Sequence, residues 1–325
     1  MPCSVWLKLH LSTSPKRLDL YERAPWKLNA KNTYGHHEGC ALRDGCLSAV
    51  GSVGTHRASA GIWYKQGCRY RLAGPVAAET NDSAEIAQKL TNPLAAMISV
   101  PIQNWFDFNL GPRKDGFRYT MQAQPVCPVQ ISKDWNLLSR TTIPVVYQQN
   151  VYGRTTQTGL SDSTESLFLS PVHTKSIIWG AGPIFLIPTG TNGLLSTRKF
   201  AIGPTAVALK HKGHTNVGLL ASHVWSVAGS DSHPDVSETY AQPFVAYTTT
   251  KAWTYAATSY DTYNWIAGRW TAIVNPIRVS KLMKLRQQRL SIGGALRCTV
   301  TSPQYQPKGC GLEFTVTPVY PAKRE

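Results

Sequence analysis

The chain has 325 residues, of which 42% are hydrophobic, and carries a formal net charge of +16. This apolar content is sufficient for a folded core and argues against disorder of the whole chain. No run of about 18 apolar residues occurs, which excludes membrane-spanning helices and leaves a β-barrel as the only membrane-spanning structure that the sequence allows.

The positive charge is spread along the chain. Residues 1–80 hold 11 Lys/Arg against 5 Asp/Glu, and residues 81–325 hold 23 against 13. The one concentrated stretch is KLMKLRQQR, Lys281 to Arg289, between two strand-like segments. We expect a solvated turn there, with a phosphate or lipid-headgroup contact as the alternative. No spacing typical of RNA- or DNA-binding motifs occurs, so no nucleic-acid partner is predicted.

The cysteines and histidines do not predict a cofactor or metal site. The seven cysteines are an odd number without the paired short spacings of a disulfide framework. The run HHEGCALRDGC, His36 to Cys46, has five residues between its cysteines, which is not the usual zinc spacing. Four further histidines are scattered over predicted loops and one strand, namely His211, His214, His223 and His233.

Residues 1–80 differ from the rest of the chain. They are rich in Gly, Arg, His and Cys and show no sustained period of 2 or 3.6, so we predict a poorly ordered basic N-terminal extension or a misassigned start. Val76–Ala78 is similar to a signal-peptide cleavage site, but Lys65, Arg69 and Arg71 interrupt the apolar segment that should precede it. The export signal is therefore expected to be absent or damaged in this sequence.

A hairpin from Phe117 to Tyr147 has the clearest pattern. In its first arm, up to Ile131, apolar residues alternate with mostly polar ones, as in a β-strand with unlike faces. The arms exceed the about 5–6 residues of ordinary strands and match the about 9–11 residues of membrane-spanning ones. Trp135 and Tyr147 lie on one face and would be about 30 Å apart, the spacing of two interfacial aromatic girdles.

The alternation continues along residues 81–325 and predicts an antiparallel up-and-down transmembrane β-barrel of about twelve strands. Connections after odd strands are mostly longer than those after even strands, as in outer-membrane barrels. Prolines occur inside several predicted strands, and we expect bulges or rim positions at Pro101, Pro125, Pro144, Pro183, Pro204, Pro243 and Pro276. The predicted strands are 96–108, 117–132, 135–147, 160–169, 177–188, 200–209, 217–228, 240–248, 253–265, 270–279, 290–301 and 312–320.

Several motifs resemble, in order and spacing, those of a family of bacterial outer-membrane β-barrels. They are LTNPLAAMISVPIQNWFDFNLGP, QPVCPVQISKDWNLLSRTTIPVV, IWGAGPIFLIPT, FAIGPTAVALK, ASHVWSVAG and QPFVAYTT, within about residues 85–320. Members of this Gram-negative family are labelled transporter, sometimes mislabelled neuromedin U, and it is similar to barrels linked with meta-pathway phenol degradation. The resemblance implies an outer-membrane location, with the lipid bilayer, lipopolysaccharide and the barrel-assembly machinery as partners. It implies no substrate and no site residues.

No set of catalytic residues emerges, so we predict a porin-like channel or small-solute transporter and no enzyme. Ser161–Ser163 and Glu165 have no histidine in a nucleophile motif beside them and are expected to cap a loop. Twelve strands fall between filled barrels of about 8 and open porins of about 16, so the lumen should be narrow or partly plugged. Polar side chains expected to line it, either setting solute selectivity or pairing with one another, are Asp107, Arg118, Gln122, Gln124, Arg140, Arg297 and Glu313.

Two alternatives stay open at this point. A soluble all-β binding or shell protein, a sandwich or jelly roll, would turn its apolar faces toward each other. An outer-membrane barrel enzyme of the phospholipase kind would need a serine and a histidine on one outer face. Ser222 and His223 are neighbours in one predicted strand, and their side chains should therefore point to opposite faces.

Overall fold

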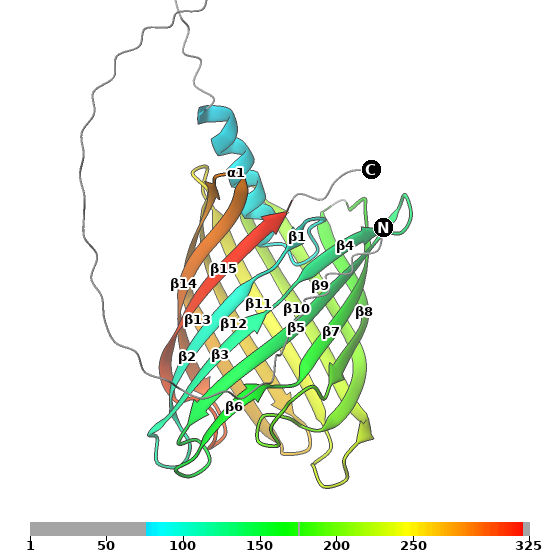
Figure 1. The fold of residues 1–325 in the computed structure, drawn as a ribbon. Helices are drawn as coiled ribbons and strands as arrows, with labels where there is room; N and C mark the ends of the chain where they lie inside the picture. Colours follow the sequence, from blue (N-terminus) through cyan, green and yellow to red (C-terminus); the bar gives the residue numbers. More distant parts are fainter. Residues whose placement is uncertain (1–75, 175, 321–325) are drawn as a thin grey trace, which may run out of the picture. The chain divides into compact units, whose positions relative to one another are not determined.

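The computed structural model describes residues 76–174 and 176–320, drawn as a ribbon in Figure 1. Predictions for residues 1–75, including the run His36 to Cys46, lie outside the described residues. A helix, α1 (Val76–Leu90), comes first, and fifteen strand segments follow in one sheet. Within the described part of the chain, no helix is long and apolar enough to cross a membrane.

The fifteen segments form twelve wall strands, because three wall strands are interrupted. β1 and β2 are separated by Val100 and Pro101, β3 and β4 by Gln124 and Pro125, and β6 and β7 by two residues. The segments are β1 (Ile98–Ser99), β2 (Ile102–Leu110), β3 (Gly116–Ala123), β4 (Val126–Gln130), β5 (Trp135–Gln149), β6 (Thr156–Leu160), β7 (Ser163–Pro171), β8 (Ile177–Ile187), β9 (Lys199–Lys212), β10 (Thr215–Gly229), β11 (Ser237–Thr248), β12 (Trp253–Asn264), β13 (Arg269–Leu285), β14 (Gln288–Thr301) and β15 (Gly309–Tyr320).

The sheet closes on itself. Neighbouring wall strands pair antiparallel, and β15 pairs with β2 from Leu312↔Phe106 to Val316↔Ile102. The predicted closed, antiparallel barrel of twelve strands is therefore confirmed. The sandwich and jelly-roll architectures are wrong, since they need two sheets packed face to face.

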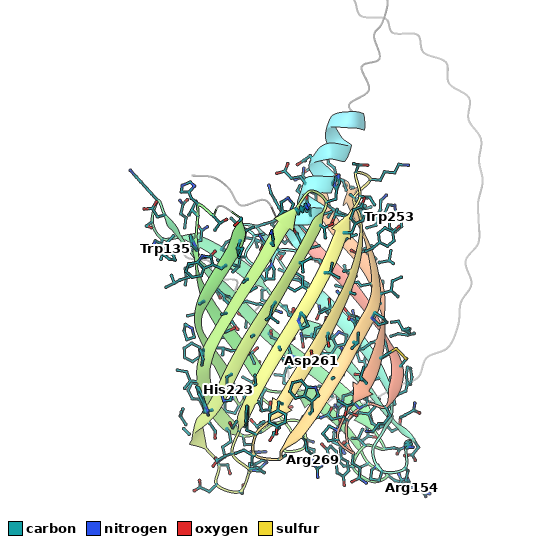
Figure 2. All side chains as sticks on the ribbon, turned by 180° about the vertical axis from the view of Figure 1, so that it is seen from behind. Trp135, Arg154, His223, Trp253, Asp261 and Arg269 are labelled. Atoms are coloured by element: carbon teal, nitrogen blue, oxygen red, sulfur yellow. A yellow bond between two sulfur atoms is a disulfide. The ribbon has the colours of Figure 1, made fainter. Side chains whose placement is uncertain are left out.

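The two faces of the wall differ, as the alternation predicts. Large apolar side chains point outward and are exposed, among them Leu219 at 47% and Val245 at 42%. Polar side chains such as Thr258 alternate with them and are buried. Trp135 and Trp253 lie at the same end of the barrel (Figure 2). So much exposed apolar surface is unfavourable in water and suits the hydrocarbon of a bilayer.

The connections alternate in length, and the expected basic turn is shorter than predicted. β13 and β14 stay paired as far as Leu285↔Gln288, which leaves only Arg286 and Gln287 in the turn. Both turn residues are exposed, so a solvated turn is present, but the rest of Lys281–Arg289 is strand. Leu282 within it is buried against α1, which explains why the hairpin continues past the neighbouring strands.

The expectation of bulges at prolines holds for only some of them. Pro101 and Pro125 lie at strand interruptions, and Pro276 lies at a register shift between Val274 and Arg278. Elsewhere the paired residues on both sides continue the ladder past the missing N–H group, so the strand is not interrupted. This holds for Pro183, Pro204 and Pro243. Pro144 instead lies where the register of β5 shifts by one residue, between Val145↔Leu160 of β6 and Thr142↔Thr164 of β7.

A disulfide links β14 to β15. Cys298 and Cys310 are register partners with Cα atoms 4.0 Å apart, and their sulfurs are bonded. The expectation that the cysteines form no disulfide framework is wrong for this pair, because strand register and not sequence spacing brings them together. Disulfides persist in oxidising compartments such as the bacterial periplasm.

Candidate solute site inside the barrel

The C-terminal end of helix α1 and the turn after it lie at the end of the barrel that carries the short turns (Figure 1). Ile86 and Ala87 pack with Ala252, Leu282 and Val319 of the rim. No helix was predicted over these residues, although Ile86 and Leu90 have helical spacing. Their apolar contacts come from distant strands, so local sequence gives only a weak signal.

Polar contacts fix the same helix end. Gln88 Nε2 donates to the carbonyl of Gly213 at 2.7 Å, and Asn216 Nδ2 donates to Thr91 Oγ1 at 2.6 Å. Arg289 forms an ion pair with Asp82. These bonds join α1 and the residue after it to the β9–β10 hairpin and to the start of β14, so the C-terminal end of the helix is held at the rim of the barrel (Figure 1).

Glu85 lies on the solvent side of α1. Its carboxylate pairs with Lys89 at 2.6 Å, one helical turn away. The hydrogen bond and charge of Lys89 lower the pKa of Glu85. Glu85 therefore belongs to the outer face of the helix and takes no part in closing the barrel.

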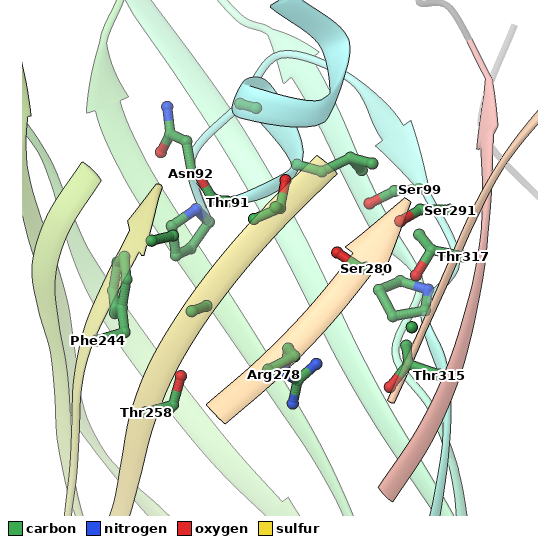
Figure 3. Close-up of a pocket in the computed structure, with 18 of the residues that line it drawn as sticks. Thr91, Asn92, Ser99, Phe244, Thr258, Arg278, Ser280, Ser291, Thr315 and Thr317 are labelled. Atoms are coloured by element: carbon green, nitrogen blue, oxygen red, sulfur yellow. The ribbon is translucent and has the colours of Figure 1, made fainter. Parts of the chain in front are cut away.

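A cavity of about 240 Å³ lies beneath α1 (Figure 3). Its roof is largely apolar and includes Leu90, Pro93 and Met97. Phe244 lines one side, and Arg278 lies deeper, away from the helix (Figure 3). A row of hydroxyl groups follows the wall, from Thr254, Thr258, Ser280, Ser291, Thr315 and Thr317.

Below the cavity, a buried carboxylate organises several polar groups. Glu313 has a fully buried side chain and forms an ion pair with Arg278. Asn275 Nδ2 donates to Glu313 Oε2 at 2.6 Å, and Thr315 Oγ1 donates to Oε1 at 2.9 Å. Arg278 also donates to the hydroxyl of Tyr260 at 3.1 Å. The charge of Arg278 is thus neutralised inside the barrel.

A second ion pair lies beside the first. Arg297 Nε donates to Asp107 Oδ1 at 3.1 Å, and both side chains are 6% exposed. The guanidinium of Arg297 stands over the ring of Trp105 at 4.2 Å and over that of Tyr260 at 5.5 Å. These contacts fit pairing across a partly filled lumen, one of the two roles predicted for the lumen charges.

The remaining predicted residues make bonds to neutral partners. Arg118 Nε donates to Gln148 at 2.9 Å. Gln122 is buried, with its amide 3.4 Å from that of Gln103. Arg140 and Gln124 both line the cavity and are joined by a bond of 3.3 Å between Arg140 NH2 and Gln124 Oε1. The lumen-lining role of all seven residues remains a prediction.

Arg278, Tyr260 and Trp105 were not predicted as interior residues. Register shifts between Ala256 and Thr258 and between Val274 and Arg278 change which alternate residues face inward. Strict alternation therefore fails in β12 and β13. Trp105 could have been found, since it belongs to the opposite set from Phe106 and Phe108 of the same strand.

Part of the interior is apolar. Leu94 from the turn after α1 packs with side chains of four wall strands, which are all at most 5% exposed. This cluster contains Leu94, Leu138, Phe168, Val207 and Leu220, with Ile178 and Tyr240 packed against it. The lumen is therefore partly filled.

The polar residues Asp162 and Glu165, near the start of β7, have different roles. Asp162 caps the loop between β8 and β9, accepting from the amide of Thr197 at 2.6 Å and from the hydroxyl of Ser196 at 2.7 Å. This is the role predicted for it. Glu165 instead lies on β7, where the hydroxyls of Ser139 and Thr141 each donate to it at 2.6 Å.

The structure gives no support to a Ser222–His223 pair. Ser222 is buried, while His223 Nδ1 lies 2.7 Å from Thr239 Oγ1 and its ring contacts that of Trp225. Among the described residues, no group of three or more His, Cys, Asp or Glu side chains could hold a metal ion.

A closed, twelve-stranded antiparallel barrel with an apolar outside and a polar interior has the architecture of an outer-membrane β-barrel protein. No protein-family model matches the chain, and no curated protein matches it.

Solved structures of such barrels do match. An outer membrane channel from Pseudomonas putida F1 has a TM-score of 0.55 and 14% identity, covering 69% of this chain and 96% of that chain. Outer membrane phospholipase A from Escherichia coli has a TM-score of 0.40 and 12% identity, covering 72% and 98%. The outer membrane protein OmpT of Vibrio cholerae has a TM-score of 0.32 and 8% identity, covering 69% and 98%. At 14% identity the first match shows a shared fold and no more.

Proposed function

We propose that this protein is a channel for small solutes in the outer membrane of a Gram-negative bacterium. The observation that carries the proposal is a closed wall that is apolar outside and encloses a cavity and polar groups. The lipid bilayer, lipopolysaccharide and the barrel-assembly machinery are its proposed partners. The six motifs in the sequence support membership of the transporter-labelled family and its relation to barrels of phenol degradation.

The lengths of the connections support one orientation. Short turns of outer-membrane barrels face the periplasm, so α1 would close the periplasmic mouth. The loop held by Asp162 and the disulfide Cys298–Cys310 would then lie toward the outside. A solute would pass the two ion pairs and leave beside α1.

The interior supports a narrow path. The ion pairs Arg278–Glu313 and Arg297–Asp107 and the apolar cluster around Phe168 occupy parts of the lumen. Passage would therefore be restricted to small solutes. The charges predicted to line the lumen, Arg118 and Arg140 among them, would select between anions and cations.

The test is conductance in planar lipid bilayers of the full chain refolded in detergent. We expect discrete current steps smaller than those of a sixteen-stranded porin recorded under the same conditions. Aromatic and anionic solutes, each added at the same concentration, should reduce the current if they enter the lumen. Folded protein that inserts but gives neither current steps nor solute flux into liposomes would contradict the channel.

A further inference from the structure

Arg140, which lines the cavity, differs from Arg278 and Arg297. Arg278 and Arg297 each have a carboxylate partner, Glu313 and Asp107 respectively. Arg140 takes part in none of the ion pairs found among the described residues, and its hydrogen-bond partner is the neutral amide of Gln124 at 3.3 Å. A guanidinium inside a protein is costly without a counter-ion, so Arg140 is a position where an incoming anion would be stabilised.

The charged residues that line the cavity with Arg140 also favour an anion over a cation. Its described lining includes Lys89, Arg140 and Arg278 but no aspartate or glutamate. Lys89 and Arg278 already have carboxylate partners outside the lining. A cation would therefore find no free carboxylate in this cavity, whereas an anion would find the charge of Arg140.

The rest of the lining is suited to an apolar body. Leu90 and Met97 form part of the roof, and Val126, Leu220 and Phe244 lie on the walls. The volume of about 240 Å³ is below the roughly 300–1,000 Å³ of sites for drug-sized ligands. It suits a molecule with one ring or a short alkyl chain.

We propose that this cavity binds small organic anions, with the carboxylate on the guanidinium of Arg140 and the apolar body beneath α1. The inference rests on the proposed function, because the cavity would be a station on the solute path. The planar guanidinium can donate two parallel N–H bonds to a carboxylate. Wall hydroxyls such as Thr258 can supply further hydrogen bonds.

Equilibrium binding of benzoate to the refolded full chain tests the site. Benzamide has the same ring and shape without the charge, and acetate has the charge without the ring. We expect benzoate to bind more tightly than either. Arg140→Gln should weaken benzoate binding by about tenfold or more, the range for a lost bond to a charged group. Arg140→Lys keeps the charge but not the planar donor pair and should fall between.

The matched control is Arg154→Gln, the same change at an exposed loop arginine (Figure 2). It should bind benzoate as the wild type does. Heat-modified migration on gels verifies that each variant is folded. If Arg140→Gln does not fold, the site is tested by comparing the binding of benzoate and benzamide to the wild type and to Arg140→Lys.

Equal binding of benzoate and benzamide, or benzoate binding unchanged in folded Arg140→Gln and Arg140→Lys, would overturn the anion site. Bilayer recordings separate this failure from failure of the channel. Current steps without Arg140-dependent binding would support the proposed channel and contradict the proposed anion site. Arg140-dependent binding without current or solute flux would support the anion site and contradict the proposed channel.

Discussion

At the scale of single residues, the interior is stabilised by neutralised charges. Glu313 is the strongest case, since its buried carboxylate accepts bonds from Arg278, Asn275 and Thr315. Removing one member of such a pair leaves the other charge buried without a partner. That loss costs more than the pair itself contributes.

Glu313→Gln should therefore destabilise the barrel by about 3–5 kcal/mol. Arg278 would lose its counter-ion, and the interior would become more positive. Urea unfolding in lipid vesicles, followed by tryptophan fluorescence, measures the loss. Glu85→Gln, at a side chain 64% exposed, is the control and should change little. Equal unfolding midpoints for Glu313→Gln and the wild type would contradict the pairing.

In the regular strands, sequence alternation predicted which residues are buried. In the strands with register shifts it did not. Asp107 and Glu313 lie in strands that keep one alternation through the middle of the wall, and both are buried. Arg278 follows the register shift beside Pro276, so its orientation could not be read from its position. The partners of Arg140 were equally hidden, because they depend on strand neighbours.

At the scale of elements, α1 is held at one mouth of the barrel through a small apolar contact. Ile86 is 8% exposed and packs against the rim with Leu282 and Val319. The contact is too small to be essential for the barrel wall. It can therefore be broken without unfolding the strands.

Ile86→Asp should release the end of α1 and increase the conductance of single channels. A buried carboxylate has no partner in this apolar contact and costs several kcal/mol. Glu85→Gln on the solvent side of the same helix should leave conductance as in the wild type. Unchanged conductance in folded Ile86→Asp would show that α1 does not limit the current.

The disulfide between β14 and β15 should also contribute to stability. Replacing both Cys298 and Cys310 with serine is expected to lower the free energy of unfolding by about 2–4 kcal/mol. Denaturant unfolding with and without reductant measures it, and the double variant should respond less to reductant than the wild type. A wild type that unfolds equally with and without reductant would speak against the cross-link.

At the scale of the whole molecule, the outer surface decides between a bilayer and water as the solvent. Leu219 and Leu194 have similar exposed fractions, 47% and 49%. Leu219 points outward from β10, and Leu194 lies in the loop between β8 and β9. A soluble protein would tolerate arginine at both positions.

Leu219→Arg should destabilise the protein in vesicles by about 2–4 kcal/mol, the cost of arginine on a barrel face near the bilayer centre. Leu194→Arg should have an effect below about 0.5 kcal/mol, as for most surface changes. Guanidinium unfolding in vesicles of the two variants gives both values. Equal, small effects would place Leu219 in water.

The barrel as a whole could be predicted from sequence because its wall obeys a local rule. Period-two alternation and the lengths of loops are visible within ten or twenty residues, and they gave the strand number and the closed form. Helix α1, the disulfide and the cavity depend on residues far apart in the chain. Met97 and Thr317, for example, line one cavity from opposite ends of the described chain.

The position of the cross-link has a consequence for biogenesis. Cys298 and Cys310 join two strands that follow each other in the chain, whereas the ring closes at the seam between β15 and β2. Formation of this disulfide therefore requires only the pairing of β14 with β15 and not the closure of the ring.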